Sequence, residues 1–250
     1  MVDLILDTNI WISHIAKDKP AGIFDIFKKQ VNDGEVILLI NDIIIDEWNR
    51  NKSKTIKNIS NEIKETSKNA LRIKTFLSEE GKEKINELLG EINSKENERI
   101  KLAENRIEEI ELMMANAIKT EVTDKMKVQV SNWALEKRAP FKQKSNSVGD
   151  ALILLSTVIH RTKDGSNHYR PGFFVSFNHT DYAQENDSDE IHEDLQDLLD
   201  NANLLYKRHI GEVLNLTPEL NVEIEMYIDN YVESYLEEQA EMRAEIRRGK

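Results

Sequence analysis

Short apolar runs that stop at polar residues recur along the chain. Residues 2–6 (VDLIL), 35–40 (EVILLI) and 173–177 (FFVSF) each have the length of a strand, and residues 204–206 form a fourth candidate. Helical patterns of apolar positions follow the first two runs, and turn-forming residues precede the second and third. Strands that alternate with helices predict an α/β domain built on a central, mainly parallel sheet.

A long stretch between the second and third runs, at about residues 51–137, keeps helical spacing and contains no Pro. Within it, apolar residues recur in alternating steps of three and four and form one seam, as in a coiled coil. The seam residues are Ile100, Ala103, Ile107, Ile110 and Met114. A structureless loop of this length would be unusual, so the sequence predicts a helical hairpin or small bundle. We expect it to be an insertion into a domain that spans residues 1–206.

Polar residues mark the starts of two predicted helices. Asn41 is a good N-cap for the helix that follows the second run. Thr217, Pro218 and Glu219 have the order of an N-cap, a first helical residue and an acidic first turn. They predict that a last long helix begins there, within a C-terminal helical segment over residues 207–250. The apolar stripe of this helix would be Ile224, Ile228, Tyr231 and Tyr235.

Composition narrows the chemistry that the chain can support. The 250 residues include no Cys, which excludes disulfide scaffolds, thiolate metal sites and cysteine nucleophiles. The longest purely apolar stretches, such as residues 151–155, are far shorter than the roughly 20 residues of a membrane span. The first residues, MVDLILD, lack the basic start of a signal peptide. We therefore expect a cytoplasmic protein with no membrane segment.

The net charge of −12 at first argues against a nucleic-acid binder, because phosphate affinity requires clustered Lys and Arg. The charge is unevenly distributed, however. Residues 181–250 hold 19 acidic and 6 basic residues, whereas residues 1–180 hold 27 and 28. Residues 136–170 hold 7 basic and 3 acidic residues. The acidic balance therefore belongs to the C-terminal part, and the remainder of the chain is compatible with a nucleic-acid partner.

Four acidic side chains and one amide fall where an open parallel sheet places its active site, beside the carboxyl ends of strands. Asp7 ends the first run, Glu47 lies a little over one turn into the next helix, and Asp150 lies in the first turn of another. Asn178 and Asp181 follow the third run. Clustered carboxylates repel one another unless a cation intervenes, and oxygen-only ligands favour Mg²⁺ or Mn²⁺ over zinc.

Four motifs resemble, in order, those of PIN-domain nucleases: LILDTNIWIS, NDIIIDEW, RAPFKQKSNSVGDALILL and FVSFNHTDY. The closest likeness is to a PIN-like branch with a basic, Pro-containing stretch before GDA, an Asn-x-x-Asp-aromatic motif and a following His-x-Asp-Leu, here residues 192–195. The resemblance covers about residues 1–50 and 136–206. It implies a three-layer PIN-like α/β domain, to which the helical insertion and the C-terminal helix are additions.

The resemblance also implies a Mg²⁺- or Mn²⁺-dependent endoribonuclease with Asp7, Glu47 and Asp150 as metal-site acids. Asn178 stands where the common family pattern has an Asp, and the acid follows at Asp181, so both join the predicted metal ligands. Asn can ligate through its carbonyl oxygen but adds no charge, so we expect one tightly held ion and a second that binds with substrate. A water activated by the metal would attack the phosphorus in line, leaving 5′-phosphate and 3′-hydroxyl ends.

Two local features refine the acidic set. Asp46 competes with Glu47, but successive helical residues point about 100° apart, so only one should face the site, and the family pattern favours Glu47. Ser147 can cap the helix that carries Asp150, and the dipole at a helix N-terminus stabilises an anion. We therefore expect Asp150 to stay ionised. Glu47 is expected either to bind metal through water or to act as the base.

Substrate contacts are predicted beside these acids. Thr8 and Asn9 are expected to hold the first acid and a substrate phosphate, with helix capping as an equal alternative for Thr8. Three basic residues before GDA would supply charge for phosphates: Arg138, Lys142 and Lys144. Phe141 lies among them as a candidate stacking surface, and a solvated loop is the alternative. His14 and His179 lie near the motifs but stay outside the catalytic set. The predicted partner is RNA, with tRNA as one candidate.

Rival functions remain open at this point. The strongest is a PIN-like scaffold without catalysis that binds protein partners through the insertion and the acidic C-terminal helix, which Asn178 favours and the four acids oppose. A haloacid-dehalogenase-type phosphatase needs a second Asp where Asn9 stands. A flap-type nuclease needs more acids and a helix-hairpin-helix element. If the enzyme is active, the helical insertion and the C-terminal helix suggest a toxin or antiphage defence effector. A protein partner or homo-oligomerisation would then control its activity.

Overall fold

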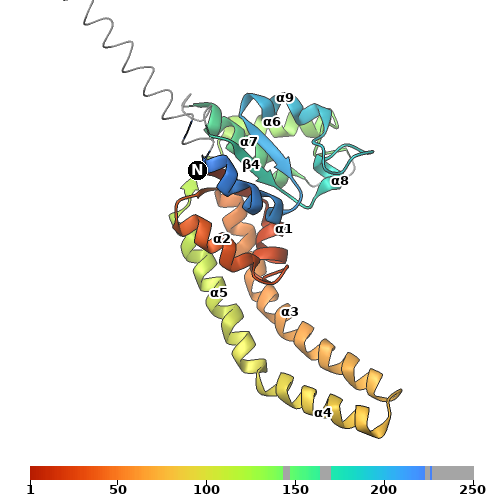
Figure 1. Cartoon of the computed structure of the whole chain (residues 1–250). Coiled ribbons are helices and arrows are strands. Elements are labelled where there is room, and N and C mark those ends of the chain that lie inside the picture. The colour runs from red at the N-terminus through yellow and green to blue at the C-terminus, as the bar shows by residue number, and fades with distance from the viewer. Residues whose placement is uncertain (143–146, 164–169, 223–225, 227–250) are drawn as a thin grey trace, which may run out of the picture.

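The computed structural model describes residues 1–142, 147–163, 170–222 and 226. Its five strands form one parallel sheet in the order β3-β2-β1-β4-β5 (Figure 1). The strands are β1 (Val2–Leu6), β2 (Val36–Ile40), β3 (Ile118–Lys119), β4 (Gly172–Val175) and β5 (Leu204–Lys207). The predicted α/β domain with a parallel sheet is therefore confirmed, and the fourth candidate strand is present as β5.

The order of the strands reverses between β1 and β4. From β1 the chain adds β2 and β3 on one side, whereas β4 and β5 extend the sheet on the other. Every residue of β1 and β4 is buried, as expected for central strands of a sheet that helices cover on both faces. In open parallel sheets, ligands bind at such a reversal, outside the carboxyl ends of the strands.

Helices cover both faces of the sheet (Figure 1). One face carries α6 (Asp124–Leu135), α7 (Val148–Lys163) and α9 (Glu193–Asn201), and the other carries α1 (Thr8–Ile10), α2 (Ile23–Asn32) and the helical residues 210–222. The π-helix η1 (Trp11–Ile15) continues α1, and the short α8 (His179–Tyr182) follows β4. In the described part of the chain, none of the helices combines the length and apolar character that crossing a membrane requires.

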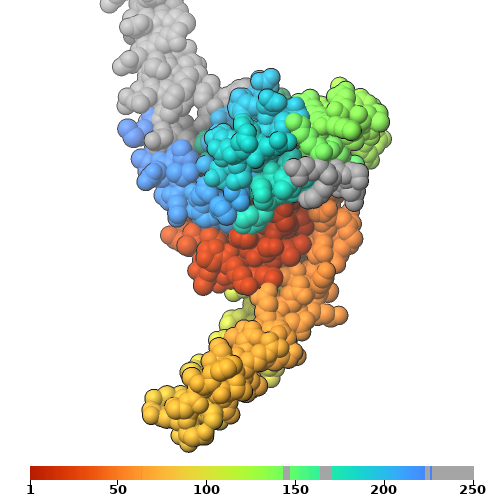
Figure 2. Space-filling model, turned by 90° about the vertical axis from the view of Figure 1, so that its right-hand side faces the viewer, coloured from red at the N-terminus to blue at the C-terminus, as the bar shows by residue number. Residues whose placement is uncertain are grey.

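Three helices form an arm that projects from the body (Figure 2): α3 (Asp42–Lys74), α4 (Glu79–Ser94) and α5 (Glu96–Asn116). Asn41 caps α3 as predicted, because its side chain accepts a hydrogen bond from the N–H of Ile44 at 3.1 Å. Where the arm meets the body, four of the five seam residues of α5 are buried: Ala103, Ile107, Ile110 and Met114. Beyond Thr55, none of the described side chains of α3 is buried. The arm is thus anchored at its base and exposed further out.

The arm and the body share their helices. The helix α3 begins at the end of β2 and passes residue 51 without interruption, and α6, which lies within the range of the predicted insertion, belongs to the layer of α7 (Figure 1). The division into a domain over residues 1–206, an insertion and a C-terminal segment stays a prediction.

The last described helix begins earlier than the predicted start at Thr217 and Pro218. Residues 210–222 are helical, and the Thr217 hydroxyl donates back to a carbonyl one turn earlier, at 2.8 Å. Pro218 has no N–H for the carbonyl of Leu214, but the side-chain amide of Gln30 donates to that oxygen at 2.8 Å instead. A contact from α2 therefore lets the helix continue through the proline. The predicted stripe of Ile224, Ile228, Tyr231 and Tyr235 lies outside the described residues.

Candidate active site

Asp7 follows β1 directly and is almost completely buried, with 3% of its surface exposed. Its Oδ2 accepts hydrogen bonds from the Ser176 hydroxyl at 2.6 Å and from the Asn9 amide at 2.8 Å. Ser176 follows β4, the strand that pairs with β1, so the two donors come from the two strand ends that meet at the reversal of the sheet. The carboxylate is therefore held in one orientation.

Asn178 connects the other two aspartates of the site. Its side-chain nitrogen donates to Oδ2 of Asp181 at 2.6 Å and to Oδ2 of Asp150 at 3.3 Å. Asp181 belongs to α8 and is 2% exposed, and it also accepts a hydrogen bond from the Ser147 hydroxyl at 3.2 Å. Asp150 lies in the first turn of α7. The amide thus contacts two carboxylates that would otherwise repel each other.

Glu47 reaches the same region from α3. Its Oε1 lies 3.4 Å from the position that a Cβ on Gly149 would occupy, next to Asp150. Its side chain is 31% exposed, and the nearest recorded cation, Arg50, is 3.9 Å away at the same oxygen. Asp46 is exposed. The sheet and α3 therefore bring together the predicted residues Asp7, Glu47, Asp150, Asn178 and Asp181, whereas their roles as ligands and catalysts stay predictions.

Burial and mutual repulsion raise the pKa values of two of these carboxyls. Burial, followed by the charge of Glu47, raises the pKa of Asp7 to about 6 despite its hydrogen bonds. Burial and then the charges of Asp7, Glu47 and Asp181 raise the pKa of Asp150 to about 7. Desolvation and three neighbouring carboxylates thus oppose the helix dipole, and the expectation that Asp150 stays ionised remains a prediction.

The donor set fits a hard divalent cation, because its side chains offer oxygen ligands, and burial and the mutual repulsion of its carboxylates raise the pKa values of Asp7 and Asp150. Two buried hydroxyls beside it, those of Thr8 and Tyr182, have no hydrogen-bond partner among the described residues. Burial and the charges of Asp150 and then of Asp7 and Asp181 raise the pKa of Tyr182, so its hydroxyl stays protonated and can donate. Among residues 1–142, 147–163, 170–222 and 226, no group of three or more acidic or histidine side chains is arranged so that it could hold a metal ion.

Of the three predicted basic residues, Arg138 contacts other parts of the fold. The guanidinium of Arg138 donates from Nε to the carbonyl of Asp194 at 3.1 Å and lies 4.7 Å from the centre of the Trp133 ring. Phe141 is only 6% exposed, so the expectation that it offers a stacking surface was wrong. Lys142 is exposed, whereas Lys144 lies outside the described residues. Arg138 therefore contacts the N-terminal end of α9, and its predicted contact with a phosphate stays a prediction.

Two functional features were missed from the sequence. Ser176 supplies the shortest hydrogen bond to Asp7, and its place as the single polar residue within FVSF could have indicated it. Lys207, Arg208 and His209 follow the apolar run of β5 directly, at the same edge of the sheet as the acids.

The fold and site define an open parallel α/β domain with an acidic cluster at its topological switch point. A sequence profile of the PIN domain matches residues 4–182, which is more than half of the chain, so the chain belongs to the PIN-domain family. The match confirms the predicted family and the PIN-like three-layer fold, and it places the chain among nuclease-type folds. Neither a curated protein nor a solved structure matches it.

The metal-free protein is expected to lose stability as the pH rises from about 4 to about 7. Asp7 and Asp150 bind protons more tightly in the folded than in the unfolded chain, so ionising them in this window favours unfolding. Thermal unfolding in EDTA should therefore show the melting temperature of the wild type falling relative to that of Asp150→Asn over this range. Near pH 8, Mg²⁺ or Mn²⁺ should raise the melting temperature of the wild type and leave that of Asp150→Asn nearly unchanged. A parallel pH response of both proteins would contradict this assignment.

Proposed function

We propose that this protein is an endoribonuclease that hydrolyses phosphodiester bonds with the help of Mg²⁺ or Mn²⁺. The observation that carries the proposal is the convergence of Asp7, Glu47, Asp150 and Asp181 at the reversal of the sheet, where burial and the charges of the other three raise the pKa of Asp150. Four carboxylates so arranged cost folding free energy unless a cation compensates them. Membership in a family of nuclease folds supports the same conclusion.

The carboxylates divide into anchored and accessible groups. Asp7, Asp150 and Asp181 would hold the cation, with Asn178 adding its carbonyl oxygen if the amide turns. When bound, the cation would neutralise these charges and lower the pKa of a water molecule. Glu47 is the more accessible acid, so we assign it the task of accepting the proton from the attacking water. The products would carry 5′-phosphate and 3′-hydroxyl ends.

The hydrogen-bonding groups around these acids would keep them in place during the reaction. Ser176 and Asn9 fix the orientation of Asp7, and Ser147 fixes Asp181. The buried hydroxyl of Thr8 can donate to a phosphate oxygen or a water molecule, which agrees with its predicted contact to substrate. Such preorganisation places donors and charges before the substrate arrives, which is a main source of catalytic rate.

The direct test is incubation of the purified protein with matched RNA and DNA oligonucleotides in Mg²⁺, Mn²⁺ or EDTA. We expect internal cleavage of RNA with either metal, no cleavage in EDTA, and products that a 5′-phosphate-dependent exonuclease degrades. DNA should be cut more slowly or not at all. Absence of cleavage by the wild type with every metal, or cleavage in EDTA, would refute the proposal.

The exposed apolar end of the arm favours a second candidate, a scaffold that binds proteins. Phe76 is 88% exposed, and its neighbours along the chain are also apolar and exposed: Leu71, Ile73 and Leu77. If the protein is a nuclease toxin or defence effector, a regulatory protein partner would bind the same apolar surface and control its activity. Expression of the wild type and of Asp7→Asn in one host separates the two. Growth inhibition by the wild type alone supports an active effector, whereas equal effects support a scaffold.

A further inference from the structure

Three of the six histidines of the chain surround one phenylalanine, Phe177. The ring centres of His14 and Phe177 are 4.3 Å apart, and those of His209 and Phe177 are 5.2 Å apart. Nδ1 of His179 lies 3.2 Å from the carbonyl oxygen of Phe177. These histidines come from η1, from the residues after β5 and from α8, so folding brings three separate segments together. We call these four residues the Phe177 ring cluster.

The Phe177 ring cluster adjoins the acidic site through the backbone and one side chain. Phe177 stands between Ser176, which donates to Asp7, and Asn178, which donates to Asp150 and Asp181. Its N–H donates to Oδ1 of Asn9 at 3.4 Å, and the amide of the same Asn9 holds Asp7. A group bound on the cluster would therefore lie next to the acids.

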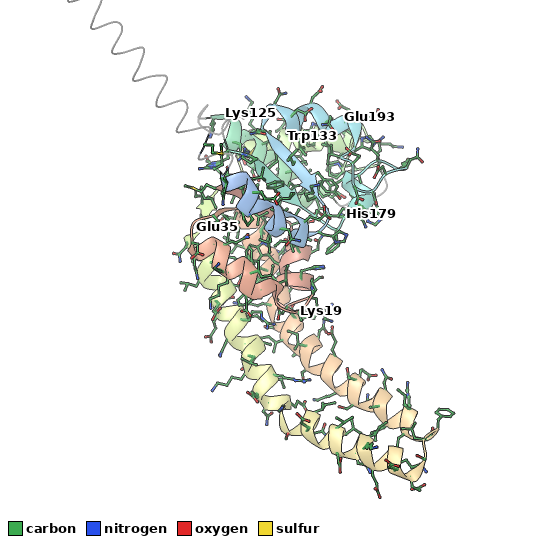
Figure 3. The ribbon with its side chains drawn as sticks, viewed as in Figure 1. Lys19, Glu35, Lys125, Trp133, His179 and Glu193 are labelled. Carbon is green, nitrogen blue, oxygen red and sulfur yellow. The ribbon has the colours of Figure 1, made fainter. Side chains whose placement is uncertain are left out.

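The rings of the cluster remain accessible. His179 and His209 are exposed, and His14 and Phe177 are partly exposed. Figure 3 shows the side chain of His179, the first residue of α8, at the outer edge of the body. Imidazole rings do not contribute to the hydrophobic core here, and the acidic site does not use them. Exposed aromatic and imidazole rings next to a phosphodiester-cleaving site are suited to stacking on unpaired nucleobases.

Basic side chains lie beside the cluster. Lys207 and Arg208 immediately precede His209, and β5 pairs with β4 in parallel, so they share the carboxyl edge of the sheet with Phe177. Their charged groups contact acids, Lys207 with Glu212 at 3.6 Å and Arg208 with Asp189 at 3.2 Å. Arg208 also donates to the Ser188 hydroxyl at 2.6 Å. The side chains of Lys207 and Arg208 are 34% and 23% exposed, so part of each faces solvent. Rings and cations along one edge form the combination that binds single-stranded nucleic acid.

We propose that the Phe177 ring cluster is a subsite that stacks an unpaired nucleobase of single-stranded RNA beside the scissile phosphate. Lys207 and Arg208 receive the phosphate of the neighbouring nucleotide. A base that is paired within an A-form duplex cannot leave its stack to reach the rings, so the subsite selects single strands, loops and bulges. This inference rests on the proposed ribonuclease function and adds the structural class of its substrate.

The test is fluorescence anisotropy with a labelled oligouridylate and with an abasic ribose-phosphate chain of the same length. All proteins carry Asp150→Asn so that RNA stays intact. Phe177→Leu and His209→Ala are each expected to weaken oligouridylate binding about tenfold, because one stacking contact is lost. Both should bind the abasic chain as the parent does. His160→Ala, which changes a histidine in the last turn of α7, serves as the matched control and should bind both chains normally.

Each outcome has one meaning. His209 is exposed, so His209→Ala should fold even if Phe177→Leu does not. The subsite is overturned if His209→Ala and a folded Phe177→Leu bind oligouridylate as the parent does. It is also overturned if a variant loses affinity equally for oligouridylate and for the abasic chain, or if the parent binds neither of them. Selective loss with oligouridylate supports it. Cleavage by the protein without Asp150→Asn is measured separately, so selective loss without any cleavage refutes the ribonuclease and leaves the stacking subsite standing.

Discussion

Replacement of Asp150 by Asn is expected to lower RNA cleavage about a thousandfold, because it removes one of the negative charges that would hold the cation at the reacting phosphate. Asp150 is the site residue whose pKa responds to all three other acids, which places it electrostatically at the centre of the cluster. The substitution preserves shape and leaves the contact with the Asn178 amide available to the side-chain oxygen. The measurement is kcat/KM for a labelled oligoribonucleotide with saturating Mn²⁺.

Adjacent acids in α3 provide the matched control for this experiment. Glu47→Gln should lower kcat at least about tenfold, as expected for the loss of a general base. Asp46→Asn should leave cleavage unchanged, because Asp46 is exposed on another side of the same helix. Wild-type cleavage by Asp150→Asn, or equal losses in Glu47→Gln and Asp46→Asn, would show that the acidic cluster does not perform the reaction.

Replacement of Arg161 by Met should destabilise the protein by up to about 3–5 kcal/mol, because it breaks a buried ion pair with Asp3. Asp3 would keep its second partner, Arg170, at 2.8 Å. Arg161 is 2% exposed and pairs with Asp3, which is 1% exposed in the central strand β1. Its Nε donates to the carbonyl of Ala202 at 2.8 Å, and its Nη2 donates to the carbonyls of Arg170 at 2.7 Å and Asn203 at 3.0 Å. One side chain thus ties α7 to β1 and to the turn before β5.

Denaturant unfolding at neutral pH measures this loss, with Lys163→Met as the control because Lys163 is exposed two residues further along α7. Gly172→Ala tests the same packing from β4, since an added Cβ would lie 2.7 Å from Cζ of Arg161. Both Arg161→Met and Gly172→Ala should be less stable than the control. A change in unfolding free energy below about 1 kcal/mol for Arg161→Met would mean that the ion pair is replaceable by apolar packing, as happens in some proteins.

The parts of the fold that depend on local pattern were predictable from the sequence. The apolar runs of β1, β2 and β4 are continuous because both faces of these strands are buried, so each run stands out. Parallel pairing then brings the ends of the strands together, which is why Asp7 and Asn178 could be placed at one edge. The amide of Asn41 likewise caps α3 because capping depends only on the next few residues.

Features that depend on distant contacts were not predictable in this way. The strand β3 has two residues, too few to show a period. Thr217 and Pro218 carry the local signature of a helix start. The helix nevertheless continues through them, because Gln30, nearly two hundred residues away in sequence, donates to the carbonyl that Pro218 cannot serve. The contact of Arg138 with the carbonyl of Asp194 likewise joins residues that are distant in the sequence. The protonation of Asp150 depends on burial and on three charges from other elements.

The helix α3 carries Glu47 in its second turn and reaches the end of the arm without a break. Thr55 is the last buried residue described along it, and the 19 residues from there to Lys74 span about 28 Å. Rotation of this outer part by about 10° would therefore carry its end through roughly 5 Å. The helix α3 also packs against η1 and α7. In the proposed nuclease, a bend of the outer part of the arm on binding a partner would therefore leave the position of Glu47 at its base unchanged.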